Sequence, residues 1–134
     1  MTTLLTIDPS DAAPIWRQIE DGVRRMVVSG VLAAGTSVPS VRDLARELRV
    51  NPATVSKAYQ RLTAAGVLEV RRGEGTFVAL REAGLVDAER RALLEDEARR
   101  FADAARDLGA DIEGALDGVR RAWGDDDDAA GGGA

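Results

Sequence analysis

The sequence predicts a mainly α-helical protein with a small β-hairpin: a winged helix-turn-helix domain followed by a C-terminal antiparallel helical hairpin. Three observations predict this fold class. Apolar residues recur at helical spacing in three segments before residue 66, two β-rich segments with a glycine turn follow, and a second helical pattern begins near residue 85. We expect the winged domain at residues 1–80, a helical dimerisation region at 81–123, and a disordered acidic and glycine-rich tail at 124–134.

The first helix is expected to start at Pro14 and to end near Gly30. Proline suits the first turn of a helix, because the N–H that it lacks would have no partner there. Apolar residues then follow at helical spacing: Ile15, Ile19, Val23, Met26 and Val27. The short apolar segment before this helix, residues 4–7, indicates an edge strand or an arm.

The second and third helices are expected on either side of a tight turn at residues 49–51. Ser40, with Asp43 three residues later, resembles a capping box that starts the second helix. Asn51 can cap the third helix, and Pro52 fits its first position. The inward faces are apolar: Val41, Leu44, Ala45 and Leu48 on the second helix, and Val55, Ala58, Tyr59 and Leu62 on the third.

A β-hairpin is expected after the third helix, which stops at Gly66 because glycine readily forms a left-handed C-terminal cap. Residues 67–71 and 76–80 are β-rich or alternate, and the turn between them, residues 72–75, holds two glycines. Three helices followed by one hairpin is the element order of a winged helix-turn-helix domain.

Two apolar stripes follow the winged domain, separated by Gly109. A short link between two helices makes an antiparallel hairpin, and its apolar edges stay exposed to water unless another chain covers them. We therefore expect a homodimer whose interface holds Leu94, Ala98, Phe101, Ala105 and Leu108 of one helix and Ile112, Leu116, Val119 and Trp123 of the next.

The composition excludes several classes of chemistry. The chain has no cysteine and no histidine, so it offers neither disulfides nor Cys or His metal ligands nor an imidazole base, and we expect neither an enzyme nor a cofactor. No stretch approaches the roughly 18 apolar residues of a membrane span, and no basic and apolar leader is evident, so we expect a cytoplasmic protein without a membrane partner.

The net charge of −5 is unevenly distributed. Residues 1–80 hold ten basic and eight acidic side chains, whereas the remainder holds eight basic and fifteen acidic ones. Because exposed charges are screened beyond about 8 Å at physiological ionic strength, a basic patch on the first part can act independently of the acidic second part. The overall charge is therefore compatible with binding to nucleic acid.

The third helix is the expected reading element for double-stranded DNA. A helix fits the major groove, and short polar side chains at its start allow a close approach to the bases. Its outer face is expected to carry Thr54, Lys57 and Arg61, while residues of the second helix and the hairpin turn bind phosphates or enter a minor groove. The predicted contacts are Ser40, Arg42, Asn51, Thr54, Ser56, Lys57, Arg61, Arg72, Gly73, Gly75 and Thr76.

The segment from Gly30 to Val78 resembles the DNA-binding domain of the GntR family of bacterial transcriptional regulators. The motifs are G-x-L-x-x-G, P-S-x-R-x-L-A, N-P-x-T-V-x-K-A-Y-x-x-L, G-x-L and R-G-x-G-T-F-V. The short helical part that follows is similar to that of the YtrA subfamily. Pro52 and Ser56 depart from the pattern, since many relatives carry arginine early in this helix, and Val38 replaces a common leucine.

The resemblance implies a homodimeric regulator, usually a repressor, that binds a pseudo-palindromic operator. It also implies roles for Arg42 at a phosphate or base, for Asn51, Thr54 and Lys57 on the recognition helix, and for Gly75 at the wing. Whether a small-molecule effector exists is unknown from the sequence. The alternative is a winged-helix module that binds a partner protein without sequence-specific DNA binding; the polar, basic outer face disfavours it.

Overall fold

The computed structural model describes the backbone of residues 5–131 and the side chains of residues 5–124. The chain divides into two compact units, Met1–Arg91 and Ala92–Ala134. The boundary between the units follows Arg91, so the start of the helix that spans Ala83–Asp107 belongs to the first unit. The reason is that Glu89 and Arg90 bind residues of the first unit through Arg24 and the carbonyl oxygen of Val28.

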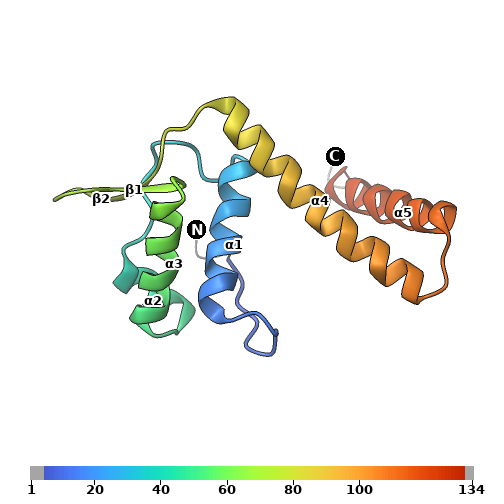
Figure 1. Cartoon of the computed structure of the whole chain (residues 1–134), viewed down its shortest axis with the longest axis horizontal. Coiled ribbons are helices and arrows are strands. Elements are labelled where there is room, and N and C mark those ends of the chain that lie inside the picture. Colours follow the sequence, from blue (N-terminus) through green and yellow to red (C-terminus); the bar gives the residue numbers. More distant parts are fainter. Residues whose placement is uncertain (1–4, 132–134) are drawn as a thin grey trace. The chain divides into compact units, whose positions relative to one another are not determined.

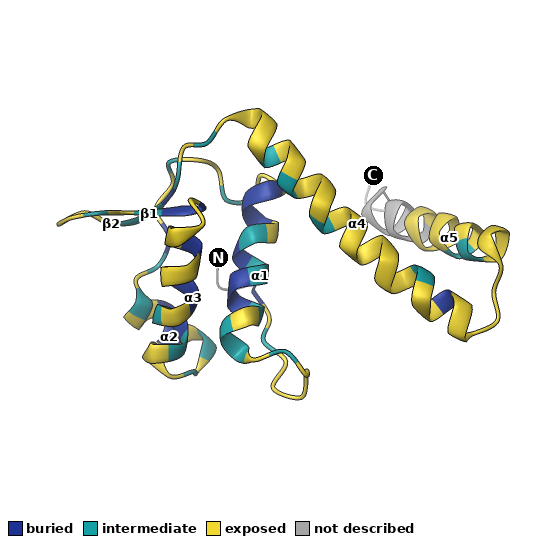
Figure 2. Ribbon diagram, viewed as in Figure 1, coloured by how far each residue is buried: buried dark blue, intermediate teal, exposed yellow. Residues whose placement is uncertain are grey.

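Three helices form the body of the first unit: α1 (Ile15–Val28), α2 (Val41–Leu48) and α3 (Pro52–Ala64). Helix α3 contacts both α1 and α2 (Figure 1). The faces that the sequence predicted to be apolar meet in one core, where buried residues gather along α1 and α3 (Figure 2). Its fully buried side chains include Ile19, Val23, Leu44, Val55, Leu62, Val67, Leu68 and Val78.

The predicted helix caps are confirmed by hydrogen bonds. The Ser40 hydroxyl accepts from the backbone N–H of Asp43 at 3.1 Å, and the Asn51 side chain accepts from that of Ala53 at 2.9 Å. Arg49, in the turn between α2 and α3, adopts φ +57°, a left-handed conformation that a non-glycine residue rarely takes. The turn between the two helices is thus closed by a C-cap on one side and an N-cap on the other.

The wing consists of β1 (Leu68–Arg71) and β2 (Gly75–Val78), paired antiparallel with Leu68 opposite Val78. A third segment joins it, because Ser37 forms a bridge with Phe77. The loop before α2, which the sequence predicts to be irregular, therefore exchanges backbone hydrogen bonds with β2 and attaches the wing to the helices.

The second unit contains most of α4 (Ala83–Asp107) and all of α5 (Ile112–Gly131), with Gly109 at φ +81° in the link between them. Within residues 92–124 only Ala105 is buried, so nearly all the predicted apolar stripe is exposed in a single chain (Figure 2). Helix α5 extends to Gly131, into the segment for which the sequence predicts a disordered tail. Extending a helix needs no new nucleus, and this segment has no proline. Residues 132–134 lie outside the described part.

Candidate nucleic-acid interface

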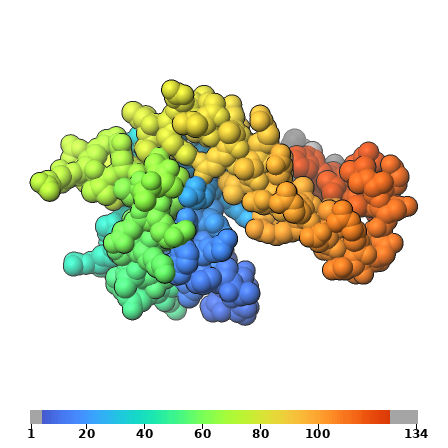
Figure 3. All heavy atoms as spheres, viewed as in Figure 1, coloured from blue at the N-terminus to red at the C-terminus, as the bar shows by residue number. Residues whose placement is uncertain are grey.

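Helix α3 presents one long face to solvent. Val55, Ala58, Tyr59 and Leu62 are buried, and the residues at the opposite side of the helical turn are exposed: Ala53, Lys57 and Gln60. Figure 3 shows α3, in green, uncovered on this face of the first unit. The helix can therefore meet a partner along its length without displacing the core.

Two residues of the predicted stripe Thr54–Lys57–Arg61 lie against α1. The Lys57 ammonium lies 4.4 Å from the centroid of the Trp16 ring, and the Arg61 guanidinium lies 4.8 Å from it. Arg61 Nε also donates to Glu20 Oε2 at 2.8 Å. Arg61, which the sequence predicts to bind the DNA backbone, is thus already bound to α1 through a buried carboxylate.

The opposite edge of α3 borders a groove of about 420 Å³ beside the wing. Ser56 and Gln60 of α3 line it together with Val70 and Thr76 of the hairpin, so two of the predicted contact residues, Ser56 and Thr76, come together here. Gln60 also lies within 3.4 Å of the Ser56 hydroxyl. Gln60, which is not among the predicted contacts, follows Ser56 by four residues and so shares its edge of the helix.

The starts of α2 and α3 lie at two capped turns. Ser40, Arg42 and Asn51 are exposed, as the prediction of phosphate and base contacts requires. The side-chain oxygen Oδ1 of Asn51 already accepts the capping hydrogen bond, which leaves the N–H groups of the side-chain amide to donate. A bidentate contact to adenine, which uses both the oxygen and the nitrogen of an asparagine, would therefore require the cap to open.

The wing tip exposes Arg72, Gly73 and Gly75. Gly73 has φ +81° and Gly75 has φ +120°, conformations in which a side chain is strained. Arg71 differs from its neighbour, because its guanidinium pairs with Glu69 at 2.7 Å and lies 4.1 Å from the Phe77 ring centroid. Arg72 is accordingly the available cation of the turn.

Within residues 5–124, no group of three or more Asp, Glu, Cys or His side chains is placed to hold a metal ion. In the same part of the chain, no helix combines the length and the apolar character needed to cross a bilayer.

The comparisons with known proteins match this geometry. Residues 16–78 match the profile of the family described as "Bacterial regulatory proteins, gntR family". A regulator from Bacillus subtilis, "Uncharacterized HTH-type transcriptional regulator YhcF", is 35% identical over 107 residues, which are 80% of this chain and 88% of YhcF. The chain belongs to the GntR family. It is a transcriptional regulator with a DNA-binding winged helix, and its similarities place it with the YtrA-like regulators.

Two other known regulators are similar to this GntR protein. The "HTH-type transcriptional repressor YtrA" of Bacillus subtilis is 40% identical over 76 residues, which cover 57% of this chain but only 58% of YtrA. A GntR family regulator from Listeria monocytogenes shares the fold with a TM-score of 0.74 at 27% identity, covering 86% of this chain and 98% of the Listeria chain.

One solved relative contains DNA. The DNA-binding domain of AraR in complex with its operator ORX1 has a TM-score of 0.50 and 26% identity, covering 56% of this chain and 93% of the AraR domain.

Proposed function

We propose that this GntR protein is a repressor that binds a pseudo-palindromic operator as a homodimer. The observation that carries the proposal is the uncovered outer face of α3, which runs from the capped residue Asn51 past Lys57 to Gln60. A helix of this kind fits the major groove, where lysine can reach guanine or phosphate and glutamine can pair with adenine. YtrA is named a repressor, and AraR is solved on its operator, which supports the same activity here.

The other predicted contacts surround this helix. Arg42, exposed in the first turn of α2, provides a charge for one phosphate, and the backbone N–H groups of that turn favour the same anion. Arg72, Gly73 and Gly75 let the wing lie against the sugar-phosphate strand or in a minor groove. Ser40, Thr54, Ser56 and Thr76 can each add a hydrogen bond from a hydroxyl group.

The exposed stripe of α4 and α5 supports the homodimer. Phe101, Leu116 and Val119 are among seven large apolar side chains exposed in the second unit, and a patch of this kind is typical of an interface. A second copy of the chain would bring a second α3 to the same duplex, so two half-sites would be read about one helical turn apart.

The test is to select the DNA fragments that the full chain retains and to measure affinity for the enriched sequence at several salt concentrations. We expect one inverted repeat, and each neutralised phosphate should add about 0.9 to the log-log salt slope. Arg42→Ala and Lys57→Ala should weaken binding, whereas Arg99→Ala, which removes the same charge from α4, should not. A promoter carrying the repeat should give less transcript when the protein is present.

Equal affinity of all three variants for DNA, or a flat salt response, would contradict the proposal. That result would favour the protein-interaction module instead.

A further inference from the structure

A continuous ladder of ion pairs connects the start of α4 with the recognition helix α3. From α3, Arg61 pairs with Glu20 at 2.8 Å, and Glu20 also contacts Arg24 at 3.4 Å, both on α1. Arg24 pairs with Glu89 on α4 at 2.8 Å, and Glu89 pairs with Arg81, just before α4, at 2.7 Å. All five side chains belong to the first unit.

The two carboxylates of the ladder are shielded from water. The Glu20 side chain is 8% exposed and that of Glu89 is 17% exposed, against 53% for Arg61 at the outer end. Ion pairs in such positions are screened less than surface pairs and are sensitive to the loss of one partner. Each carboxylate serves two guanidinium groups, so the pairing of one arginine depends on the pairing of the next.

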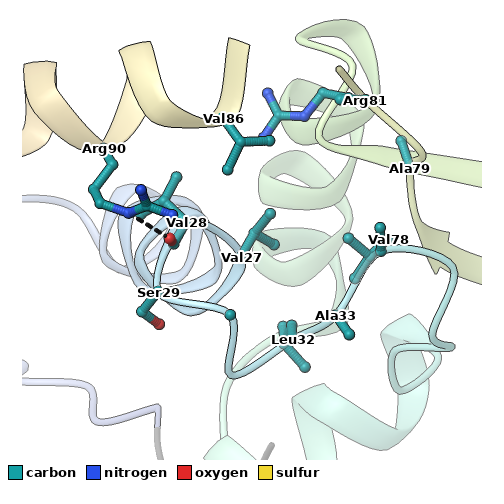
Figure 4. A pocket seen from close by; sticks show the side chains of 12 residues that line it. Val27, Val28, Ser29, Leu32, Ala33, Val78, Ala79, Arg81, Val86 and Arg90 are labelled. Atoms are coloured by element: carbon teal, nitrogen blue, oxygen red, sulfur yellow. Dashed lines mark hydrogen bonds between the residues drawn. The ribbon is translucent and has the colours of Figure 1, made fainter. Parts of the chain in front are cut away.

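The first turns of α4 make polar contacts beside a pocket that is partly open to solvent. A cavity of about 250 Å³ lies between Val86 of α4 and the end of α1 (Figure 4). Arg90 Nε donates to the carbonyl oxygen of Val28 at 2.9 Å across this joint (Figure 4). Glu89 and Arg90 thus contribute polar contacts that hold this part of α4 against α1.

We propose that this ladder couples the attachment of α4 to the recognition helix, and that Arg61 acts as a positioning residue rather than as a DNA contact. When Glu89 is bound, Arg24 is drawn towards α4 and Glu20 is available to Arg61, which fixes α3 against α1. When Glu89 is lost, Glu20 is the carboxylate left to Arg24, so Arg24 draws closer to Glu20 and weakens its pairing with Arg61. The proposal rests on the proposed function, since its readout is the affinity for DNA.

The first test measures the affinity of the full chain and of its Arg61→Gln variant for the enriched operator sequence at several salt concentrations. A positioning role predicts an affinity that is roughly three- to tenfold lower with an unchanged salt slope, because no phosphate contact is removed. A slope that falls by about 0.9 would identify Arg61 as a phosphate contact and overturn the proposal.

The second test is a double-mutant cycle between Glu89→Gln and Arg61→Gln. Coupling predicts that the double variant binds no more weakly than the weaker single variant, because both changes break the same ladder. Glu82→Gln is the control, since it removes the same charge from an exposed side chain adjacent to α4. Two results would overturn the coupling. One is a loss of affinity in the double variant equal to the product of the two single losses. The other is equal affinity of Glu89→Gln and Glu82→Gln for the operator.

A third measurement needs no DNA. Trp16 and Trp123 are the two tryptophans of the chain, so Trp123→Phe leaves Trp16, under Lys57 and Arg61, as a reporter of the ladder's outer end. Glu89→Gln in this background should shift the Trp16 emission in the same direction as Arg61→Gln does. An unchanged emission would overturn the ladder, whereas a shift in a protein that retains no DNA would overturn only the proposed function.

Discussion

The hydroxyl group of Tyr59 on α3 donates a hydrogen bond of 2.8 Å to the carbonyl oxygen of Pro39, directly before the N-cap of α2. This contact ties the recognition helix to the start of its companion helix, while the Tyr59 ring is buried in the core. The hydrogen bond therefore joins α3 to the segment that directly precedes α2.

Replacement of Tyr59 by phenylalanine tests this tie. We expect Tyr59→Phe to lower the free energy of unfolding by about 1 kcal/mol, because the ring still fills the core while the Pro39 carbonyl loses its partner. Denaturant unfolding followed by circular dichroism measures the change. Thr63→Val serves as the comparison, because it removes a hydroxyl group that is hydrogen-bonded within α3 itself. It should lower the free energy of unfolding by less. Equal stability of Tyr59→Phe and the parent chain would show that the tie contributes nothing.

Alkaline pH should destabilise the protein through the same residue. Burial raises the pKa of Tyr59, and the charge of Glu47 raises it further. The unfolded chain then loses this proton near the ordinary pKa of about 10 while the folded chain retains it, so the free energy of unfolding falls as pH rises above about 10. The free energy of unfolding of the parent chain and of Tyr59→Phe, measured at about pH 9 and pH 11, checks this expectation. An equal fall in the free energy of unfolding of both proteins would contradict it.

Asn51 combines a structural and a recognition role that two substitutions separate. Asn51→Ala should cost about 1 kcal/mol of stability through loss of the α3 cap, and it should also relax sequence preference. Asn51→Ser keeps a capping oxygen, so we expect near-parental stability with the same relaxed preference. Unfolding measurements combined with fragment selection distinguish the two. A parental preference in Asn51→Ser would mean that Asn51 only caps the helix.

The wing glycines should differ in their tolerance of side chains. Gly73, at φ +81°, lies near the left-handed region that asparagine accepts, whereas Gly75, at φ +120°, does not. We expect Gly73→Asn to be nearly neutral and Gly75→Asn to lower stability by about 1–3 kcal/mol, as a strained backbone position does. Thermal unfolding of both variants, compared at equal concentration, tests the order; a more stable Gly75→Asn would refute it.

The proposed homodimer should depend on the exposed apolar stripe of the second unit. The double variant Leu94→Asp with Phe101→Asp should be monomeric and should bind an inverted repeat poorly, because two charges would have to be buried at the interface. Sedimentation at several protein concentrations measures the oligomeric state. Leu80→Asp changes a similarly exposed leucine of the first unit and should leave the oligomeric state unaltered. A dimer that persists in the double variant would contradict this assignment.

Much of the first unit was predictable because its signals are local. Ser40 and Asn51 begin α2 and α3 through hydrogen bonds to residues two or three positions away, and Gly66 ends α3 at φ +78°. The apolar spacing of Val55, Ala58, Tyr59 and Leu62 likewise selected the buried face.

Contacts between distant residues and the propagation of a helix are not indicated by local sequence signals. Ser37 joins the wing by pairing with Phe77, and Arg61 turns to Glu20, 41 positions earlier. Neither partner is indicated by local spacing. The acidic segment after residue 124 has a composition typical of disorder, yet α5 continues through it to Gly131.

The sequence by itself determined the order of the elements, their caps and the family, because these follow from periodicity, from short-range hydrogen bonding and from motifs of adjacent residues. Only the tertiary structure decided that both cations of α3, Lys57 and Arg61, lie against groups of α1. Lys57 and Arg61 share one edge of the helix, but the buried carboxylate of Glu20 and the ring of Trp16 meet that edge only after α1 has packed against α3. Charge pairing across a core depends on that packing.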